Sequence, residues 1–223
     1  TGTAPEGVFG VFVTRIHADG TYGWTRTMSG NSFARGMAVG ADSAGNLYVT
    51  GHFYRTVDFN PGAEVQNLSS SGDYDIFLAK FTVGGDYLWT KQIGGSDWDM
   101  VQDLKIDAWG NIYLTGLFST GVDFNPEAGV DYRTTHSHIG GAFLTKFNAD
   151  GSYAWTQVMG DSTSRWAATG LALDPSGQLY VVGERWPLSA SVGTQLVSDL
   201  FLSKYDSCGQ LLWTQMLNGL VSG

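Results

Sequence analysis

A tryptophan-threonine pair recurs four times along this chain of 223 residues, and this repeat constrains the fold more than any other feature. An apolar segment that begins with phenylalanine precedes each pair at a constant spacing. The pairs begin at Trp24, Trp89, Trp155 and Trp213, and the segments are Phe12–Ile16, Phe77–Phe81, Phe143–Phe147 and Phe201–Tyr205. The intervals between tryptophans are 65, 66 and 58 residues. A period of this length indicates one structural unit that is repeated and stacked.

Each repeat divides into four short apolar, β-branched or aromatic runs, which we name strands a, b, c and d. In the second complete repeat they cover residues 102–107, 111–118, 142–147 and 153–159. A third motif, which runs from an aspartate to a glycine, joins a to b: Asp42–Gly51, Asp107–Gly116 and Asp174–Gly183. Its Asp and Gly are typical of tight turns. Because no segment shows a helical period, the sequence predicts an all-β chain.

Four antiparallel strands repeated in series predict the blades of a β-propeller. Fourteen strands make three and a half blades, which we place at 8–29 (half blade), 36–93, 101–159 and 168–217 in one propeller segment, 1–223. A closed propeller usually has about four to eight blades, and an open arc exposes sheet edges. Because Thr1-Gly2 resembles the end of a strand b, we expect a segment of a longer propeller, with closure by a second copy as the alternative.

Several motifs carry a resemblance to a known family. They are Gly-Asn-Ile-Tyr-Leu-Thr-Gly, Val-Asp-Phe-Asn-Pro, Phe-Leu-Thr-Lys-Phe and Trp-Thr-Lys-Gln-Ile-Gly-Gly. With them the chain closely resembles the SBBP (seven-bladed β-propeller) repeat family of bacterial proteins over nearly its whole length. The a–b portion is also similar to NHL-type propellers, which implies that strand a is innermost, beside the central channel. The resemblance implies no particular activity, because propellers serve as scaffolds, ligand-binding modules and enzymes.

Composition excludes several classes of protein. With 13% aromatic and only 15% charged residues, the chain does not resemble a disordered one. No run of about 18 apolar residues predicts a membrane span. A net charge of −9 argues against nucleic acid as a partner. Cys208 is the single cysteine, so an internal disulfide is excluded. We expect an extracellular or cell-surface location, although a lone cysteine also fits the cytoplasm.

The longer links between strands all fall on one side of the predicted blades, which we call the connection face. They are the b–c links 54–75, 119–141 and 184–199 and the d–a links 29–35, 94–100 and 160–166. Loops on a rigid scaffold often carry recognition residues. The d–a links differ most between repeats, and they supply the predicted binding residues: Phe33, Arg35, Asp97, Trp98, Asp99, Arg165 and Trp166. For Trp98 and Trp166, packing at the rim of the core is the structural alternative.

Repeated positions have a structural interpretation, and none predicts a catalytic or metal site. We expect the four tryptophans to pack between adjacent blades. Asp97 and Asp99 lack an identifiable partner base, so no catalytic residue is predicted. Asp58/Asn60 and Asp123/Asn125 could offer oxygens to Ca²⁺, but Asx turns explain them with fewer requirements, and no cofactor is expected. His136 and His138 have no apparent third ligand.

These observations favour a non-enzymatic structural or protein-interaction module in a larger bacterial surface or secreted assembly. Its partner would be another protein, further repeats of the same chain or a second copy. One alternative is a carbohydrate- or small-ligand-binding propeller, because tryptophan beside carboxylates suits sugar stacking. Another is a propeller lyase or glycosidase, although the sequence contains no Ser-His-Asp order, metal triad or phosphate loop.

Overall fold

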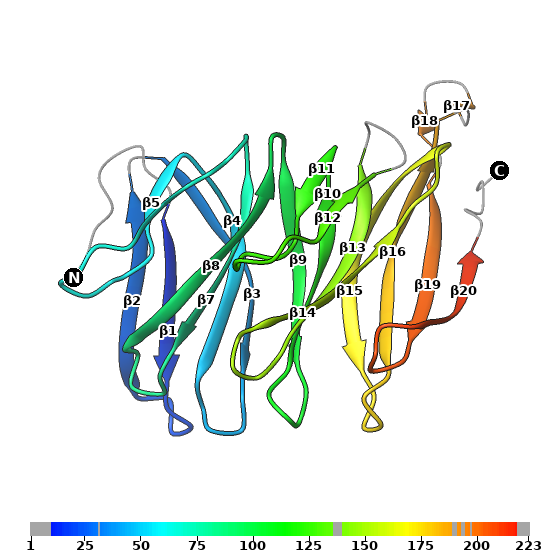
Figure 1. The fold of residues 1–223 in the computed structure, drawn as a ribbon. Helices are drawn as coiled ribbons and strands as arrows, with labels where there is room; N and C mark the ends of the chain where they lie inside the picture. The colour runs from blue at the N-terminus through cyan, green and yellow to red at the C-terminus, as the bar shows by residue number, and fades with distance from the viewer. Residues whose placement is uncertain are drawn as a thin grey trace. The chain divides into compact units, whose positions relative to one another are not determined.

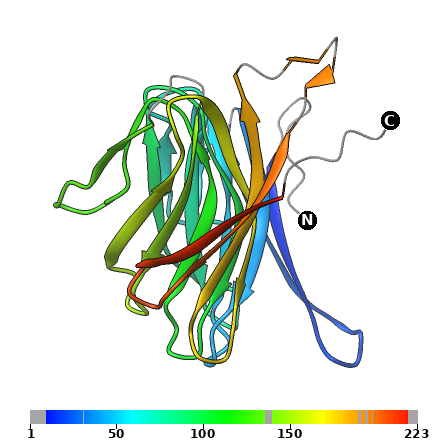
Figure 2. The same ribbon diagram turned by 90° about the vertical axis from the view of Figure 1, so that its right-hand side faces the viewer.

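The computed structural model describes residues 10–30, 32–135, 140–188, 191–192, 195–196 and 198–217. These residues contain no helix, and their paired strands are antiparallel, as the sequence predicts. Contacts divide the chain into two compact units, 1–100 and 101–223. Figures 1 and 2 show the strands of each unit from two sides.

The first unit holds a half blade and a whole blade. The half blade consists of β1 (Val11–Ile16) and β2 (Tyr22–Gly30), which correspond to strands c and d. In the whole blade the order is β3 (Phe33–Ala41), β4 (Leu47–Tyr54), β7 (Asp75–Phe81) and β8 (Tyr87–Gly95). The b–c link of this blade forms two short strands, β5 (Thr56–Asp58) and β6 (Asn67–Ser69), and β5 pairs with β2 of the half blade.

The second unit contains two blades. One is β9 (Asp99–Ile106), β10 (Ile112–Phe118), β13 (Gly141–Phe147) and β14 (Tyr153–Met159), and β9 begins in the last residues of the first unit. The other is β15 (Ser164–Leu173), β16 (Leu179–Pro187), β19 (Asp199–Tyr205) and β20 (Leu211–Leu217). Their b–c links form the hairpins β11 (Gly121–Asp123) with β12 (Tyr132–Thr134) and β17 (Ser191–Val192) with β18 (Gln195–Leu196).

The Asp-to-Gly turn motif links strands of its own blade, as Asp107, Tyr113 and Lys146 of the second whole blade illustrate. Asp107 Oδ1 accepts hydrogen bonds from the backbone N–H of Trp109 and Asn111, both at 2.9 Å. Its Oδ2 accepts the Tyr113 hydroxyl at 3.0 Å, and the Lys146 ammonium lies 5.5 Å from the centre of that ring. Burial, followed by the charge of Asp107, raises the pKa of Tyr113. The repeated Asp, Tyr and Lys are therefore structural.

Two of the repeated tryptophans pack between adjacent blades, as predicted. The indole of Trp155 covers the c–d turn of the next blade, where a Cβ added to Gly209 would lie 2.9 Å from the ring. Trp24 covers Gly85 in the same way and donates its indole N–H to the Val83 carbonyl at 3.2 Å. The glycine of this turn therefore gives the ring room to approach the backbone.

The fourteen predicted strands are present, but the links on the connection face contain fewer loop residues than the sequence predicts. Six further short strands occupy the b–c links in the described part of the chain. The d–a links are short, because the a–b pairing continues to Phe33↔Tyr54 in one blade and to Ser164↔Pro187 in another. Backbone groups near a buried sheet need partners, so the ladder extends into segments of loop-like composition. The prediction that Phe33, Arg35, Asp99, Arg165 and Trp166 lie in loops is therefore wrong, since all five lie in strands.

Candidate functional site

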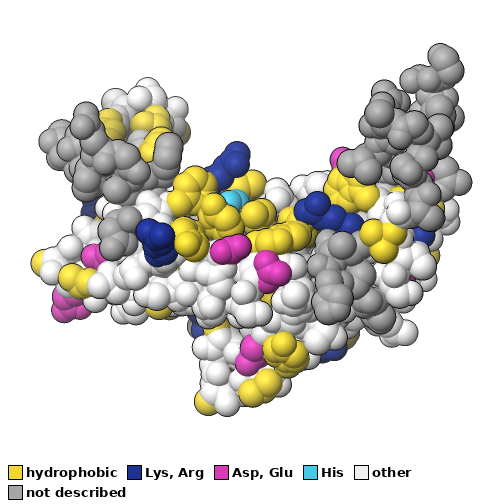
Figure 3. Space-filling model, turned by 90° about the horizontal axis from the view of Figure 1, so that it is seen from above, with side chains coloured by type: hydrophobic (Ala, Val, Ile, Leu, Met, Phe, Trp, Pro, Cys, Tyr) yellow, Lys and Arg dark blue, Asp and Glu magenta, His cyan; other side chains and the backbone are white. Residues whose placement is uncertain are grey.

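The connection face combines aromatic and charged side chains where strand a begins and strand b ends. Figure 3 looks onto this end of the strands, where hydrophobic side chains gather next to basic and acidic ones. The predicted binding residues fall into two groups, one in each unit. Phe33, Arg35, Asp97, Trp98 and Asp99 belong to the first unit, and Arg165 and Trp166 belong to the second.

Three aromatic rings surround the ring of Tyr74 in the first unit. Phe33 pairs with Tyr54 across β3 and β4, and Arg35 pairs with His52 on the same face of the sheet. The Tyr74 ring, from the b–c link, lies 5.7 Å from the centres of the Phe33, His52 and Tyr54 rings. Edge-to-face contacts at such distances stabilise aromatic clusters beyond simple burial.

His52 is a buried titratable group in this cluster. Its side chain is only 6% exposed, and its Nδ1 atom has no hydrogen-bond partner. Burial, together with the positive charge of Arg35, lowers the pKa of His52 to about 4. The imidazole is therefore neutral near pH 7 and contributes its ring rather than a charge.

The d–a link 94–100 is held by the b–c link 54–75 through backbone hydrogen bonds. The backbone N–H of Asp73 donates to the Asp97 carbonyl at 3.2 Å, and that of Asp99 donates to the Tyr74 carbonyl at 2.7 Å. The backbone at Gly72 approaches Ser96 so closely that no Cβ would fit there. The Tyr74 cluster and the two aspartates therefore belong to one connected structure.

Asp97 and Asp99 use their carboxylates to hold this link. Asp99 is fully buried, and its Oδ2 accepts the N–H of Gly95 at 2.7 Å. Asp97 Oδ1 accepts the N–H of Trp98 at 2.9 Å, and the Trp98 side chain is partly buried. Hydrogen bonds of this kind fix the backbone of a turn. The geometry is that of a structural link, in which both carboxylates hold backbone N–H groups of the turn.

The second unit carries two crossed pairs of arginine and tryptophan. Arg165 is opposite Trp186 across β15 and β16, and Trp166 is opposite Arg185. The guanidinium of Arg165 lies 5.5 Å from the centre of the Trp186 ring, and that of Arg185 lies 5.8 Å from the Trp166 ring. Both distances allow cation–π attraction. Because successive residues of a strand point to opposite faces, the two pairs lie on opposite sides of the sheet.

The Trp166 side of this sheet is part of the core. Its ring lies 5.0 Å from that of Phe201, and its indole N–H donates to Asp161 at 3.1 Å. Arg185 donates its Nε–H to the Ser164 hydroxyl at 2.9 Å and lies 3.3 Å from the Asp161 carboxylate. Burial raises the pKa of Asp161, but hydrogen bonds from Thr163 and Trp166 and the charge of Arg185 lower it below its ordinary value. Trp166 therefore fits the interpretation of rim packing.

Several residues of the site were missed by sequence reasoning, although a signal for them exists. Strand b ends differently in each blade after its glycine: His52-Phe-Tyr54, Leu117-Phe-Ser119 and Glu184-Arg-Trp186. Variation between repeats was the criterion that selected the d–a links. The same criterion, applied one strand further, would have found His52, Tyr54, Arg185 and Trp186.

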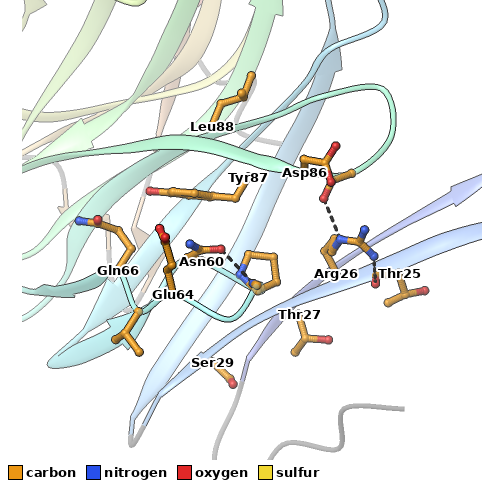
Figure 4. A pocket seen from close by; sticks show the side chains of 14 residues that line it. Thr25, Arg26, Thr27, Ser29, Asn60, Glu64, Gln66, Asp86, Tyr87 and Leu88 are labelled. Carbon is orange, nitrogen blue, oxygen red and sulfur yellow. Dashed lines mark hydrogen bonds between the residues drawn. The ribbon is translucent and has the colours of Figure 1, made fainter.

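A groove of about 770 Å³ in the first unit is lined by β2, the b–c link and the start of β8 (Figure 4). Arg26 on its wall donates to the Gly85 carbonyl at 2.7 Å and to the Thr25 carbonyl at 3.2 Å. The opposite wall contains Asn60, whose Oδ1 accepts the N–H of Gly62 at 2.9 Å. The side chains of Arg26 and Asn60 thus hold the local backbone.

The Asp-Phe-Asn-Pro segments form Asx turns. Asp58 Oδ1 accepts the N–H of Asn60 at 3.0 Å and of Gln66 at 2.8 Å, and Asp123 Oδ1 accepts the N–H of Asn125 at 3.0 Å. Among the residues that the structure describes, no three His, Cys, Asp or Glu side chains group as metal ligands do. His136 and His138 lie outside the described residues. No helix in the described part of the chain has the length and hydropathy to cross a membrane.

No family model matches the chain. It is similar to an uncharacterized WD repeat-containing protein, L264, of Acanthamoeba polyphaga mimivirus, with 23% identity over 92% of this chain and 17% of that protein. It is also similar to the regulatory protein FlaEY of Caulobacter vibrioides, with 26% identity over 92% of this chain and 22% of that protein. The chain therefore spans about a fifth of the length of these relatives. The serial four-stranded sheets and the WD repeat-containing relative together give the chain a β-propeller-like repeat fold.

Proposed function

We propose that this chain is a non-enzymatic protein-interaction module, a propeller segment of the SBBP type in a bacterial surface or secreted assembly. One observation carries the proposal. On the connection face, equivalent positions carry different aromatic and cationic residues in each blade, whereas the opposite turns repeat the same Asp-to-Tyr motif. A surface that varies on a constant scaffold is where recognition evolves without loss of the fold.

Arg165 and Trp186 are the centre of the proposed contact surface. They form a cation–π pair on the face of β15 and β16 opposite the core, and both side chains are partly exposed. Val182 of β16 and Leu200 of β19, in the same blade, add exposed apolar surface. Arginine and tryptophan are enriched among the residues that dominate binding energy at protein interfaces, especially beside apolar surface.

The relatives support an interaction role rather than catalysis. One is named as a WD repeat-containing protein and the other as a regulatory protein. In this chain the carboxylates that could act as acid and base, Asp97 and Asp99, are engaged with backbone N–H groups. Extracellular placement remains part of the proposal and follows from the SBBP resemblance.

A capture experiment with matched variants tests the proposal. The full chain, the double variant Arg165→Ala/Trp186→Ala and the control Trp109→Ala are each immobilised and exposed to an extract of the source organism. Trp109 is 67% exposed in a turn on the opposite face. We expect a protein that the full chain and the control retain and the double variant loses, with Kd raised about 30-fold when that protein is purified.

The same variants distinguish the alternatives. If all three proteins retain the same set, the Arg165–Trp186 surface does not bind a partner and the proposal is wrong. Signals on a glycan array that disappear only with the double variant would instead support the carbohydrate-binding alternative.

A further inference from the structure

The groove of about 770 Å³ in the first unit carries polar groups that the fold does not use. Its walls are β2, the b–c link 54–75 and the beginning of β8, and they are mainly polar (Figure 4). Four side chains on these walls form no hydrogen bond to another described residue: Thr27 and Ser29 of β2, and Glu64 and Gln66 of the link. Hydroxyl, carboxylate and amide groups together offer both donors and acceptors. The groove is therefore suited to a ligand that itself carries donors and acceptors side by side.

The charged residues that line the groove do not favour an anion. The guanidinium of Arg26 donates to two backbone carbonyls, and the Asp86 carboxylate accepts the Thr82 hydroxyl at 3.2 Å. The third charged lining residue is Glu64, whose carboxylate repels phosphate and other anions at short range. These charges favour a neutral, hydroxyl-bearing ligand over a nucleotide or a sugar phosphate.

The ring of Tyr87 supplies a flat apolar surface beside these polar groups. Figure 4 shows this ring between Leu88 and the side chains of Glu64 and Gln66. An edge-to-face contact with Phe81, with the ring centres 5.9 Å apart, holds the ring in place. Small-molecule sites combine aromatic surface with a few polar groups that set the orientation of the ligand. This arrangement matches a sugar ring, which has C–H groups on one face and hydroxyls around its edge.

The next repeat treats the equivalent tyrosine differently. In the second unit Asp131 accepts the hydroxyl hydrogen of Tyr153, and Nε of Arg133 lies 2.6 Å from Oδ1 of Asp131. In the first whole blade the positions of Asp131 and Arg133 are occupied by Gln66 and Leu68. A carboxylate–arginine pair therefore caps the tyrosine of the second whole blade, whereas an amide and an apolar side chain stand beside that of the first.

We propose that this groove binds a neutral saccharide. One face of a sugar ring lies on Tyr87, and the hydroxyls of the sugar bond to Glu64 and Gln66. The two hydroxyl side chains of β2 bond to the sugar from the wall that this strand forms. Each sugar hydroxyl both donates and accepts, which this mixed set of side chains satisfies. The volume of about 770 Å³ lies within the range of about 300 to 1,000 Å³ that is typical of small-molecule sites.

A saturation-transfer NMR titration of the full chain tests the proposal. The probes are the neutral disaccharides maltose, cellobiose and lactose, with inorganic phosphate as an anionic probe and spermidine as a cationic one. We expect saturable binding of at least one disaccharide, with Kd raised about tenfold by Glu64→Ala/Gln66→Ala because two hydrogen-bonding side chains are lost. Tyr87→Leu should raise Kd about fivefold, because leucine removes the flat ring. Leu211 occupies the same position in the last repeat, so the fold accepts leucine there.

A matched control removes an amide and a carboxylate from the same b–c link. It is Asn67→Ala/Asp73→Ala, in which both residues are exposed and lie outside the groove lining, so Kd should not change. The proposal is overturned if no disaccharide binds, or if the wild type and the groove variants bind equally. It is also overturned if only phosphate or only spermidine binds, because the ligand is then charged. Arg165→Ala/Trp186→Ala should leave disaccharide binding unchanged, so this proposal and the protein-interaction proposal can fail separately.

Discussion

Replacing His52 with leucine should make the stability of this protein less dependent on pH between 7.5 and 5. The pKa of His52 is about 4 in the folded state, compared with about 6.5 in an unfolded chain. The unfolded state therefore binds the proton more readily, so the contribution of the neutral imidazole is complete above pH 6.5 and is lost as the pH falls toward 4. The full difference is about 3 kcal/mol, and about 2 kcal/mol of it is lost by pH 5.

Leucine is the appropriate replacement because Leu117 occupies the equivalent position of the next repeat and is buried there. The free energy of unfolding is measured by urea titration with tryptophan fluorescence at pH 7.5, 6.5, 5.5 and 5. The carboxylates with lowered pKa values, such as Asp42 and Asp161, titrate below this range. His17→Gln is the control, because His17 is exposed in a turn. If the wild type and His52→Leu lose stability in parallel, the inference of a buried neutral imidazole is wrong.

Three further predictions concern packing, turns and metal ions. Trp155→Ala should lower the free energy of unfolding by about 3 kcal/mol, because the indole covers the next blade. Trp213 is 37% exposed, so Trp213→Ala should lower it by less than about 1.5 kcal/mol in the same urea titration. Gly209→Ala should lower the unfolding midpoint more than Gly20→Ala does. Both glycines have φ near +84°, but only Gly209 lies under a tryptophan ring, so equal shifts of the midpoint would contradict this packing. Adding EDTA or CaCl₂ should leave the thermal midpoint unchanged, because Asp58 and Asp123 already accept backbone N–H groups, and a rise with calcium would refute that reasoning.

The long strands could be predicted because apolar alternation and turn residues agree along each repeat. Strand d of the second whole blade, for example, is expected at 153–159 and found at Tyr153–Met159. The ends of the strands on the connection face could not be predicted in this way. The segment from Ser164 to Trp166 has a mixed polar composition, and only pairing with Pro187, Trp186 and Arg185 makes it a strand. Tertiary hydrogen bonding overrides local preference at such positions.

The candidate site was predictable in location but not in orientation. Variation between repeats pointed to Arg165 and Trp166, and the alternation along β15 sends one to the outer face and the other into the core. That alternation depends on where the strand begins, which the sequence leaves open. Tyr74 was missed because it lies in a link without periodicity, and its role follows from contacts with residues more than 20 positions away.

The pairing of β5 with β2 affects how this protein should unfold. Ser29 and Gly30 of the half blade pair with Asp58 and Val57, which belong to the b–c link of the next blade. Neighbouring modules are therefore joined by a backbone ladder as well as by side-chain stacking. In a linear array the coupling between neighbours determines whether modules melt singly or together. A shared ladder strengthens that coupling, so amides of the half blade and of the following blade should exchange with solvent through one cooperative opening.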